Sequence, residues 1–205
     1  MTLIVLGVTL VSLVMVNVAI MLVWGWAARD SDYSSQVVSP EEAAKAGVEL
    51  QTRSTLEDAE AKGELLVAQI EQVMIESAPT LRFEDPKHPD ESIKSCFGPF
   101  SATNGKLVRD RYYHGTLPVA DDQWSTIRDQ SIVAAKGLGI ELAEIKTSDP
   151  TTHLIVLATE SERIKITINN TDSRGANTSE KSFIVLNIAC HLPAEKFNSP
   201  VEPTR

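Results

Sequence analysis

The sequence has only two cysteines in 205 residues, Cys96 and Cys190, and they do not form a C-x-x-C motif. Because no cysteine precedes Cys96, the apolar N-terminal run is not followed by a cysteine that could carry a lipid. Metal-ligand spacing along a helix is also missing from the four histidines, which are His88, His114, His153 and His191. We therefore expect no metal site, although ligands from distant strands could still meet.

Motifs for catalysis are equally scarce. The sequence has no G-x-S-x-G element for a nucleophilic serine. Its Gly137-Leu138-Gly139 segment ends a predicted helix, whereas phosphate sites place glycines before one. Asp121 and Asp122 are more simply explained as a helix cap and a first-turn acid than as a catalytic pair. The prediction is a protein that is not an enzyme and holds no cofactor.

Charged residues are absent from positions 2–28, where Leu, Val, Ile, Met and Ala dominate. A helix of this length spans about 40 Å, more than the roughly 30 Å of bilayer hydrocarbon. Trp24 and Trp26 follow at the expected membrane interface. The pattern predicts a single-pass transmembrane anchor over 1–28. A signal peptide cleaved after Ala27 is the alternative, but its apolar part would be shorter and would follow basic residues.

One polar residue, Asn17, lies in the middle of this predicted span. An amide in hydrocarbon often forms a hydrogen bond to another helix, so Asn17 is a candidate contact with a membrane partner. Alternatively, a long apolar helix simply tolerates it.

The cysteine pair indicates on which side of the membrane the domain lies. Two lone cysteines in an exported domain most simply form one disulfide, closing a loop of about 95 residues. Cys96 and Cys190 are therefore predicted to be bonded, with the domain on the extracytoplasmic side of the cell membrane. The alternative is two buried free thiols in a cytosolic domain.

Hydrophobic periodicity predicts an α+β fold over 54–193, with two helices on one face of a mostly antiparallel sheet. The first helix begins in a Ser54–Glu57 capping box and ends before Pro79. Its apolar positions are Leu56, Ala59, Gly63, Leu66, Ile70, Val73 and Ser77, widened by Leu65 and Met74. The second runs from Asp121 or Asp122 to Gly137 or Gly139, with its inner face at Trp124, Ile127, Ser131, Ala134, Ala135 and Leu138.

Strands are expected at 80–84, 106–116, 140–147, 153–159, 164–168 and 183–190, with an irregular loop over 85–99. Residues 29–53 are interpreted as a stalk with a short helix that starts at Ser39 and stops at Gly47. Residues 194–205 are expected to be a disordered tail.

A possible docking face contains Lys106, Arg109 and Arg111, and Arg109 and Arg111 are expected on one face of a strand. It would suit an acidic surface or a glycan; the alternative is an ordinary charged, solvated face. The formal charge of −9 is consistent with both interpretations. It argues against binding to nucleic acid and is compatible with a cationic partner.

The segment from Ser54 to Pro193 resembles the LppA-like lipoproteins of actinobacterial cell envelopes. The matching pieces are the Ser54–Asp58 helix start, the Cys96–Pro99 loop, Trp124 in its helix, and the closing Cys190–Pro193 run. The resemblance implies an exported, membrane-attached domain with a cysteine pair, and it carries over no activity. This chain departs from the family because a long apolar span stands where those lipoproteins have a lipidated cysteine.

These observations predict a bilayer-anchored, non-enzymatic accessory or interaction subunit of a membrane-protein complex in the cell envelope, for example a respiratory or secretion assembly. A module that binds a lipid or cell-wall component through loops 85–105 and 169–180 is the alternative, and an envelope hydrolase is a weaker one. An apolar pocket between helix 54–78 and the sheet would favour the lipid binder, whereas filled packing would favour the subunit.

Overall fold

The computed structural model describes residues 38–84, 86, 88–117, 119–140, 142–143, 152–159, 163–171 and 181–197. The predicted anchor over 1–28, including Asn17, lies outside the described residues.

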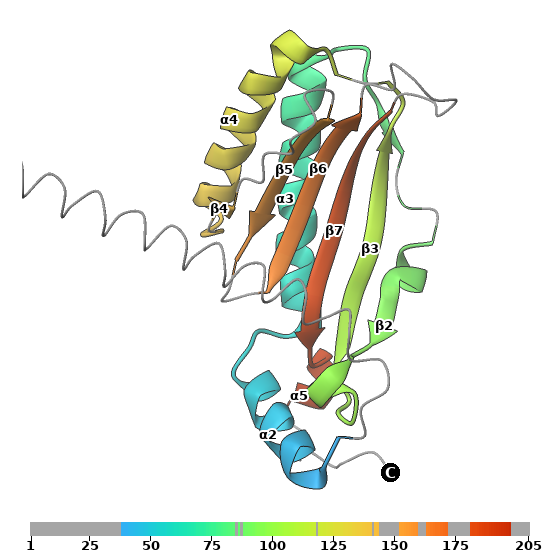
Figure 1. Ribbon diagram of the computed structural model, residues 1–205, viewed down its shortest axis with the longest axis vertical. Coiled ribbons are helices and arrows are strands. Elements are labelled where there is room, and N and C mark those ends of the chain that lie inside the picture. Colours follow the sequence, from blue (N-terminus) through green and yellow to red (C-terminus); the bar gives the residue numbers. More distant parts are fainter. Residues whose placement is uncertain are drawn as a thin grey trace, which may run out of the picture.

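Seven strands in the described part of the chain form one antiparallel sheet (Figure 1). Its order is β1-β3-β7-β6-β5-β4, and the short β2 also pairs with β3. The strands are β1 (Phe83–Glu84), β2 (Ile93–Ser95), β3 (Lys106–Gly115), β4 (Leu142–Ala143), β5 (Thr152–Ala158), β6 (Ile164–Thr171) and β7 (Lys181–His191). The sheet centres on β3, β7 and β6, the longest strands, and the alternation of Ile164, Ile166 and Ile168 buries one side of β6.

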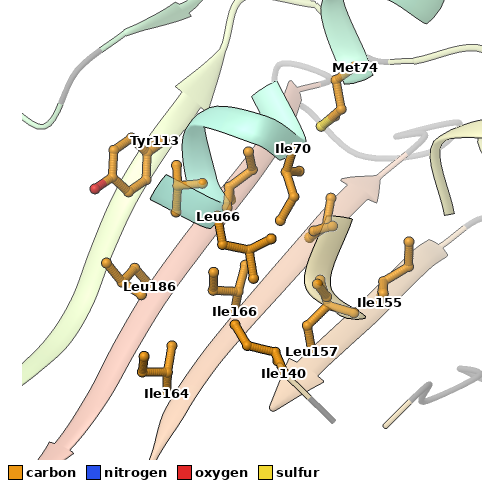
Figure 2. Packing of buried hydrophobic residues seen from close by; sticks show 14 of the residues in the cluster. Leu66, Ile70, Met74, Tyr113, Ile140, Ile155, Leu157, Ile164, Ile166 and Leu186 are labelled. Carbon is orange, nitrogen blue, oxygen red and sulfur yellow. The ribbon is translucent and has the colours of Figure 1, made fainter. Parts of the chain in front are cut away.

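Two helices, α3 (Leu56–Ser77) and α4 (Asp121–Gly137), lie side by side on the same face of this sheet (Figure 1). The predicted two-layer α+β arrangement is therefore confirmed in the described residues. Between the layers, Leu66 and Ile70 of α3 meet Ile166 and Leu186 of the sheet, and all four are fully buried (Figure 2). This packing leaves the helix–sheet interface filled by side chains.

The periodic face of α3 is largely as predicted, since Leu56, Ala59, Gly63, Leu66, Ile70 and Met74 are buried. Leu65 is an exception, being 50% exposed. The predicted cap is wrong by one residue. Thr55, not Ser54, caps the helix by accepting the backbone N–H of Asp58 at 3.1 Å. On α4, Trp124, Ile127, Ser131 and Ala135 are buried as expected.

The predicted stop at Gly47 is wrong. Helix α2 runs over Pro40–Gln51, and Gly47 is one of its buried residues. Leu50, near its end, is fully buried in a second hydrophobic cluster with Cys96, Cys190 and Leu192. Half of the segment interpreted as a stalk therefore packs on the domain, because its apolar face covers this cluster.

Irregular segments also contain short elements that periodicity does not reveal. The loop over 85–99 includes β2 and the 3-10 helices η1 (Pro89–Ser92) and η2 (Gly98–Phe100). The described start of the predicted tail forms a short helix, α5 (Ala194–Phe197), near α2 (Figure 1).

Candidate functional site

Strand β3 changes its register in the middle, and this change decides which side chains face outwards. Val108 pairs with Ile188 and Arg111 with Leu186, so β3 has one more residue than β7 in this stretch. The extra residue forms a bulge at Asp110, which has a φ of 52° and donates its backbone N–H to the Asn187 side chain at 3.0 Å. A positive φ is unusual for a residue other than glycine, and bulges re-aim the side chains around them.

Beyond the bulge, Arg111 points to the helix side of the sheet and is buried. Its Nη1 lies 2.5 Å from a Glu60 carboxylate oxygen and 2.6 Å from one of Glu64, both on α3. Burial alone would lower the pKa of the Arg111 guanidinium, but hydrogen bonds and charge from Glu64 and Glu60 raise it. Arg111 therefore stays charged, and its positive charge faces two carboxylates.

Tyr113 joins the same network by donating its hydroxyl to Glu64 at 2.5 Å. Burial, followed by the hydrogen bond to Glu64, raises the pKa of Tyr113 far above its ordinary value of 10. The phenol is therefore a permanent donor at physiological pH. It fixes one oxygen of Glu64 while Arg111 holds the other.

Arg111 also holds the loop between β1 and β2. Its Nε donates to Ser92 Oγ at 2.9 Å and its Nη2 to the Pro89 carbonyl at 3.3 Å. Ser92 in turn donates its hydroxyl to the Pro89 carbonyl at 2.5 Å. A buried arginine thus connects α3, β3 and η1, and it fixes η1 at a set distance from the strand.

A cavity of about 550 Å³ lies between this loop and β3. The loop side supplies Glu84, Pro86, His88, Glu91 and Ser92, and the strand side supplies Arg109, Asp110, Arg111, Tyr112 and His114. Strands β1 and β2 pair only with the two ends of β3, so within the described residues no strand pairs with 109–113 on this edge. The cavity occupies that gap.

Rings and a cation line the strand side. Tyr112 and His114 are stacked, with ring centroids 5.6 Å apart, and Tyr112 is 42% exposed. The guanidinium of Arg109 lies 5.6 Å from the Phe97 ring centroid, and its Nε lies 3.4 Å from an Asp110 carboxylate oxygen. Arg109 is therefore already paired on one side and packed on the other.

The structure joins Cys96 to Cys190, as predicted, with their Cα atoms 5.6 Å apart. Arg53 follows α2 and reinforces this end of the sheet, donating to the Cys190 carbonyl at 2.6 Å and packing over the Phe100 ring. Gly105 lies against the bridge: a Cβ there would be 2.5 Å from Cys190 Sγ. The disulfide is thus enclosed by packed side chains.

The predicted common face of Arg109 and Arg111 is wrong. The Asp110 bulge reverses the alternation, so Arg109 is exposed whereas Arg111 is buried against α3. Lys106 lies before the bulge, and its Nζ donates to Ser95 Oγ at 3.3 Å. The three cations therefore have three different environments and do not form one patch.

Sequence reasoning missed the carboxylates of α3 and the placement of His88 and His114 at one cavity. Glu60 and Glu64 stand one turn apart on the border of the apolar stripe, next to Ala59 and Gly63. That spacing is a usable signal for paired carboxylates facing a neighbour. The shared cavity of the two histidines has no sequence signal, because it depends on how the loop folds back.

Among the residues that the structure describes, no three or more His, Cys, Asp or Glu side chains are arranged to hold a metal ion. In the same part of the chain, no helix has the length and hydropathy needed to cross a bilayer.

The fold and the sequence of this chain are similar to those of known proteins. The chain is similar to the crystal structure of the lipoprotein LppA from Mycobacterium tuberculosis, with a TM-score of 0.54 and 8% sequence identity. That match covers 78% of this chain and 91% of the solved one, and it supports the fold alone. The curated proteins include no match. The model of the LppA family, described as a lipoprotein confined to pathogenic Mycobacterium, matches residues 31–194. Since that match spans about four-fifths of the sequence, the chain belongs to the LppA family of membrane-associated envelope lipoproteins.

Proposed function

We propose that this protein is a membrane-anchored, extracytoplasmic domain that acts as a non-enzymatic accessory or interaction subunit of a cell-envelope complex. The observation that supports it best is the filled interface between α3 and the sheet. Leu66, Ile70 and Met74 are 0% exposed there, and a Cβ on Gly63 would lie 2.8 Å from Leu186 Cδ1. A lipid carrier needs an apolar cavity at this place, whereas a domain that presents its surface to a partner does not.

The disulfide supports an extracytoplasmic location for the domain. Such bonds persist outside the reducing cytosol, and here the bridge is packed against Leu50 and Leu192 instead of being exposed to solvent. Anchoring through the apolar run over 1–28, in place of a lipidated cysteine, remains part of the proposal.

Native mass spectrometry of the full-length chain, extracted from its own membrane in mild detergent, tests the proposal. We expect a stoichiometric larger complex that is lost when residues 1–28 are deleted. The variant Asn17→Leu is a finer test, and it weakens the association if the amide contacts a partner helix. A monomer with no bound protein at all protein concentrations would contradict the accessory role.

A second candidate function is a binding module for a small polar cell-wall component. The observation that favours it is the cavity between the β1–β2 loop and β3, whose volume falls in the size range of ligand sites. Four of its lining residues, Pro86, His88, Glu91 and Ser92, belong to the predicted binding loop 85–105. A small-molecule adduct on the monomer in the same mass spectrum would favour this candidate.

A further inference from the structure

The cavity beside β3 is bordered by a buried ion pair, an arrangement that carries a desolvation cost. Arg111 is a buried charge, and burying an ion pair stabilises a fold little when apolar packing could replace it. Here the pair does more than fill space, because Arg111 holds both Ser92 and the Pro89 carbonyl of η1. The Asp110 bulge, with its unusual φ, turns Tyr112 and His114 to the cavity side. Arg111 therefore ties the loop to the strand, and the bulge sets which side chains of the strand line the cavity between them.

The charges around the cavity do not balance. Arg109 is paired with Asp110, and Arg111 with two carboxylates of α3, Glu60 and Glu64. Two further acids, Glu84 and Glu91, line the loop side, and within the described part of the chain their carboxylates make no ion pair or hydrogen bond. The surroundings are therefore negative. An anionic ligand would be repelled, and the overall charge of −9 adds to this effect.

An exposed aromatic ring completes the site. Tyr112, which lines the cavity, is stacked against His114 and is 42% exposed as a residue. An organic cation gains both from carboxylates and from the face of such a ring. A compact amine or guanidinium on an aliphatic stem fits this combination, since the stem can cover the ring while the charge reaches the acids.

We propose that this cavity binds a lysine or arginine side chain of a basic segment in a partner polypeptide. This inference rests on the proposed function as an interaction domain and names the chemistry of the partner. The unpaired edge of β3 over 109–113 lies next to the cavity, so a bound segment would find backbone groups beside the pocket that takes its side chain.

Calorimetric titration of the full-length chain in detergent with N-acetylated, C-amidated trilysine tests this. Glu84→Gln and Glu91→Gln each weaken binding about threefold, and the double variant about tenfold. Tyr112→Leu weakens it about threefold, whereas Tyr112→Phe, which keeps the ring, leaves it unchanged. The matched control is Glu195→Gln, an exposed acid on α5 that does not line the cavity and is expected to have no effect.

Unchanged affinity in the double variant would overturn the proposal, and so would an equal loss in Glu195→Gln, which would indicate general attraction to an acidic protein. Spermidine serves as the free-amine probe, and affinity equal to that of trilysine would overturn the polypeptide source. Failure here is separable from failure of the proposed function. A complex seen by native mass spectrometry without trilysine binding would contradict the cavity alone, and trilysine binding without a complex would contradict the accessory role alone.

Discussion

The described residues form two hydrophobic clusters, which bury their side chains in different ways. The main core lies between the sheet and the helices α3 and α4, and it consists mostly of aliphatic side chains from many elements, with Tyr113 and Trp124 among them (Figure 2). The end cluster is small: Leu50, Cys96, Cys190 and Leu192, with Phe100 and Phe197 packed against it. The first depends on the area it removes from water, whereas the second depends on a covalent bond.

The difference shows how a short element can be kept on a domain. Helix α2 buries only Ala43, Ala46, Gly47 and Leu50, too little apolar surface for a stable twelve-residue helix by itself. The disulfide holds β7 and the Cys96 loop together under Leu50, and Arg53 fastens the helix end to the Cys190 carbonyl. A covalent staple therefore provides the surface on which α2 folds.

Removing the bridge should have the largest effect on this comparison. We expect the double variant Cys96→Ala, Cys190→Ala to lower the free energy of unfolding of the whole domain by about 4–5 kcal/mol. The bridge joins residues 94 apart, so its loss frees the unfolded chain, although it lies at the edge of the fold. Urea unfolding measures it. A loss below about 1 kcal/mol would mean that the end cluster is stable without its covalent bond.

Truncating one fully buried aliphatic side chain in each cluster separates them. Ile166→Ala in the main core should cost about 3–4 kcal/mol and Leu50→Ala somewhat less. The sharper readout is hydrogen exchange. Ile166→Ala should raise exchange throughout β6 and β7, whereas Leu50→Ala should raise it in α2 and leave β6 protected. Equal deprotection of β6 by both variants would show that the two clusters unfold as one unit.

Sequence patterns predicted the main core better than the end cluster, for a physical reason. The α3 stripe and the alternation of β6 repeat over many residues, so tertiary contacts reinforce a signal already present locally. At the end cluster, Gly47 is a residue type that often ends a helix. The helix nevertheless continues to Gln51, because Leu50 is buried against the bridge. That contact joins residues that are far apart in the sequence, and no local pattern contains it.

The candidate site was the least predictable part. The predicted strand over 106–116 contains all of β3 and one residue more. However, the face of each side chain depends on register, and one bulge reversed Arg111 relative to Arg109. A bulge arises from pairing with β7 and leaves no composition signal at Asp110. The disulfide was predictable, since an exported domain with two cysteines has one simple pairing.

Glycine contacts offer a smaller, matched test of how rigid each cluster is. A Cβ on Gly105 would meet both sulfurs of the bridge, at 2.5 and 2.8 Å, whereas one on Gly63 would meet the end of the Leu186 side chain at 2.8 Å. We expect Gly105→Ala to cost about 1–3 kcal/mol, because the bridge cannot move aside. Gly63→Ala should cost less, because Leu186 can shift and alanine favours the helix by about 1 kcal/mol. Thermal unfolding compares the stability of the two variants. A larger loss of stability in Gly63→Ala than in Gly105→Ala would mean that the main core, not the end cluster, is the more rigid.

The smallest effect on stability is expected at the start of α2, where a capping box formed by Ser39 and Glu42 stabilises the first turn. The other end of this helix packs on the end cluster through Leu50. Ser39 donates its backbone N–H to the Glu42 carboxylate at 3.0 Å, and this bond, with that from the Ser39 hydroxyl, lowers the pKa of Glu42 below its ordinary value of 4.5. A carboxyl with a lowered pKa stabilises the folded state above its unfolded-state pKa, and this contribution is lost as the pH falls through the folded-state value. Protection from exchange in the first turn of α2, after correction for the intrinsic pH dependence of amide exchange, should therefore fall as the pH drops below the ordinary pKa of 4.5. Glu42→Gln should abolish that pH dependence, while Glu41→Gln, beside it but outside the box, should retain it. If protection in the wild type does not fall over this pH range, the bridge and Leu50, without the cap, are sufficient to hold α2 in place.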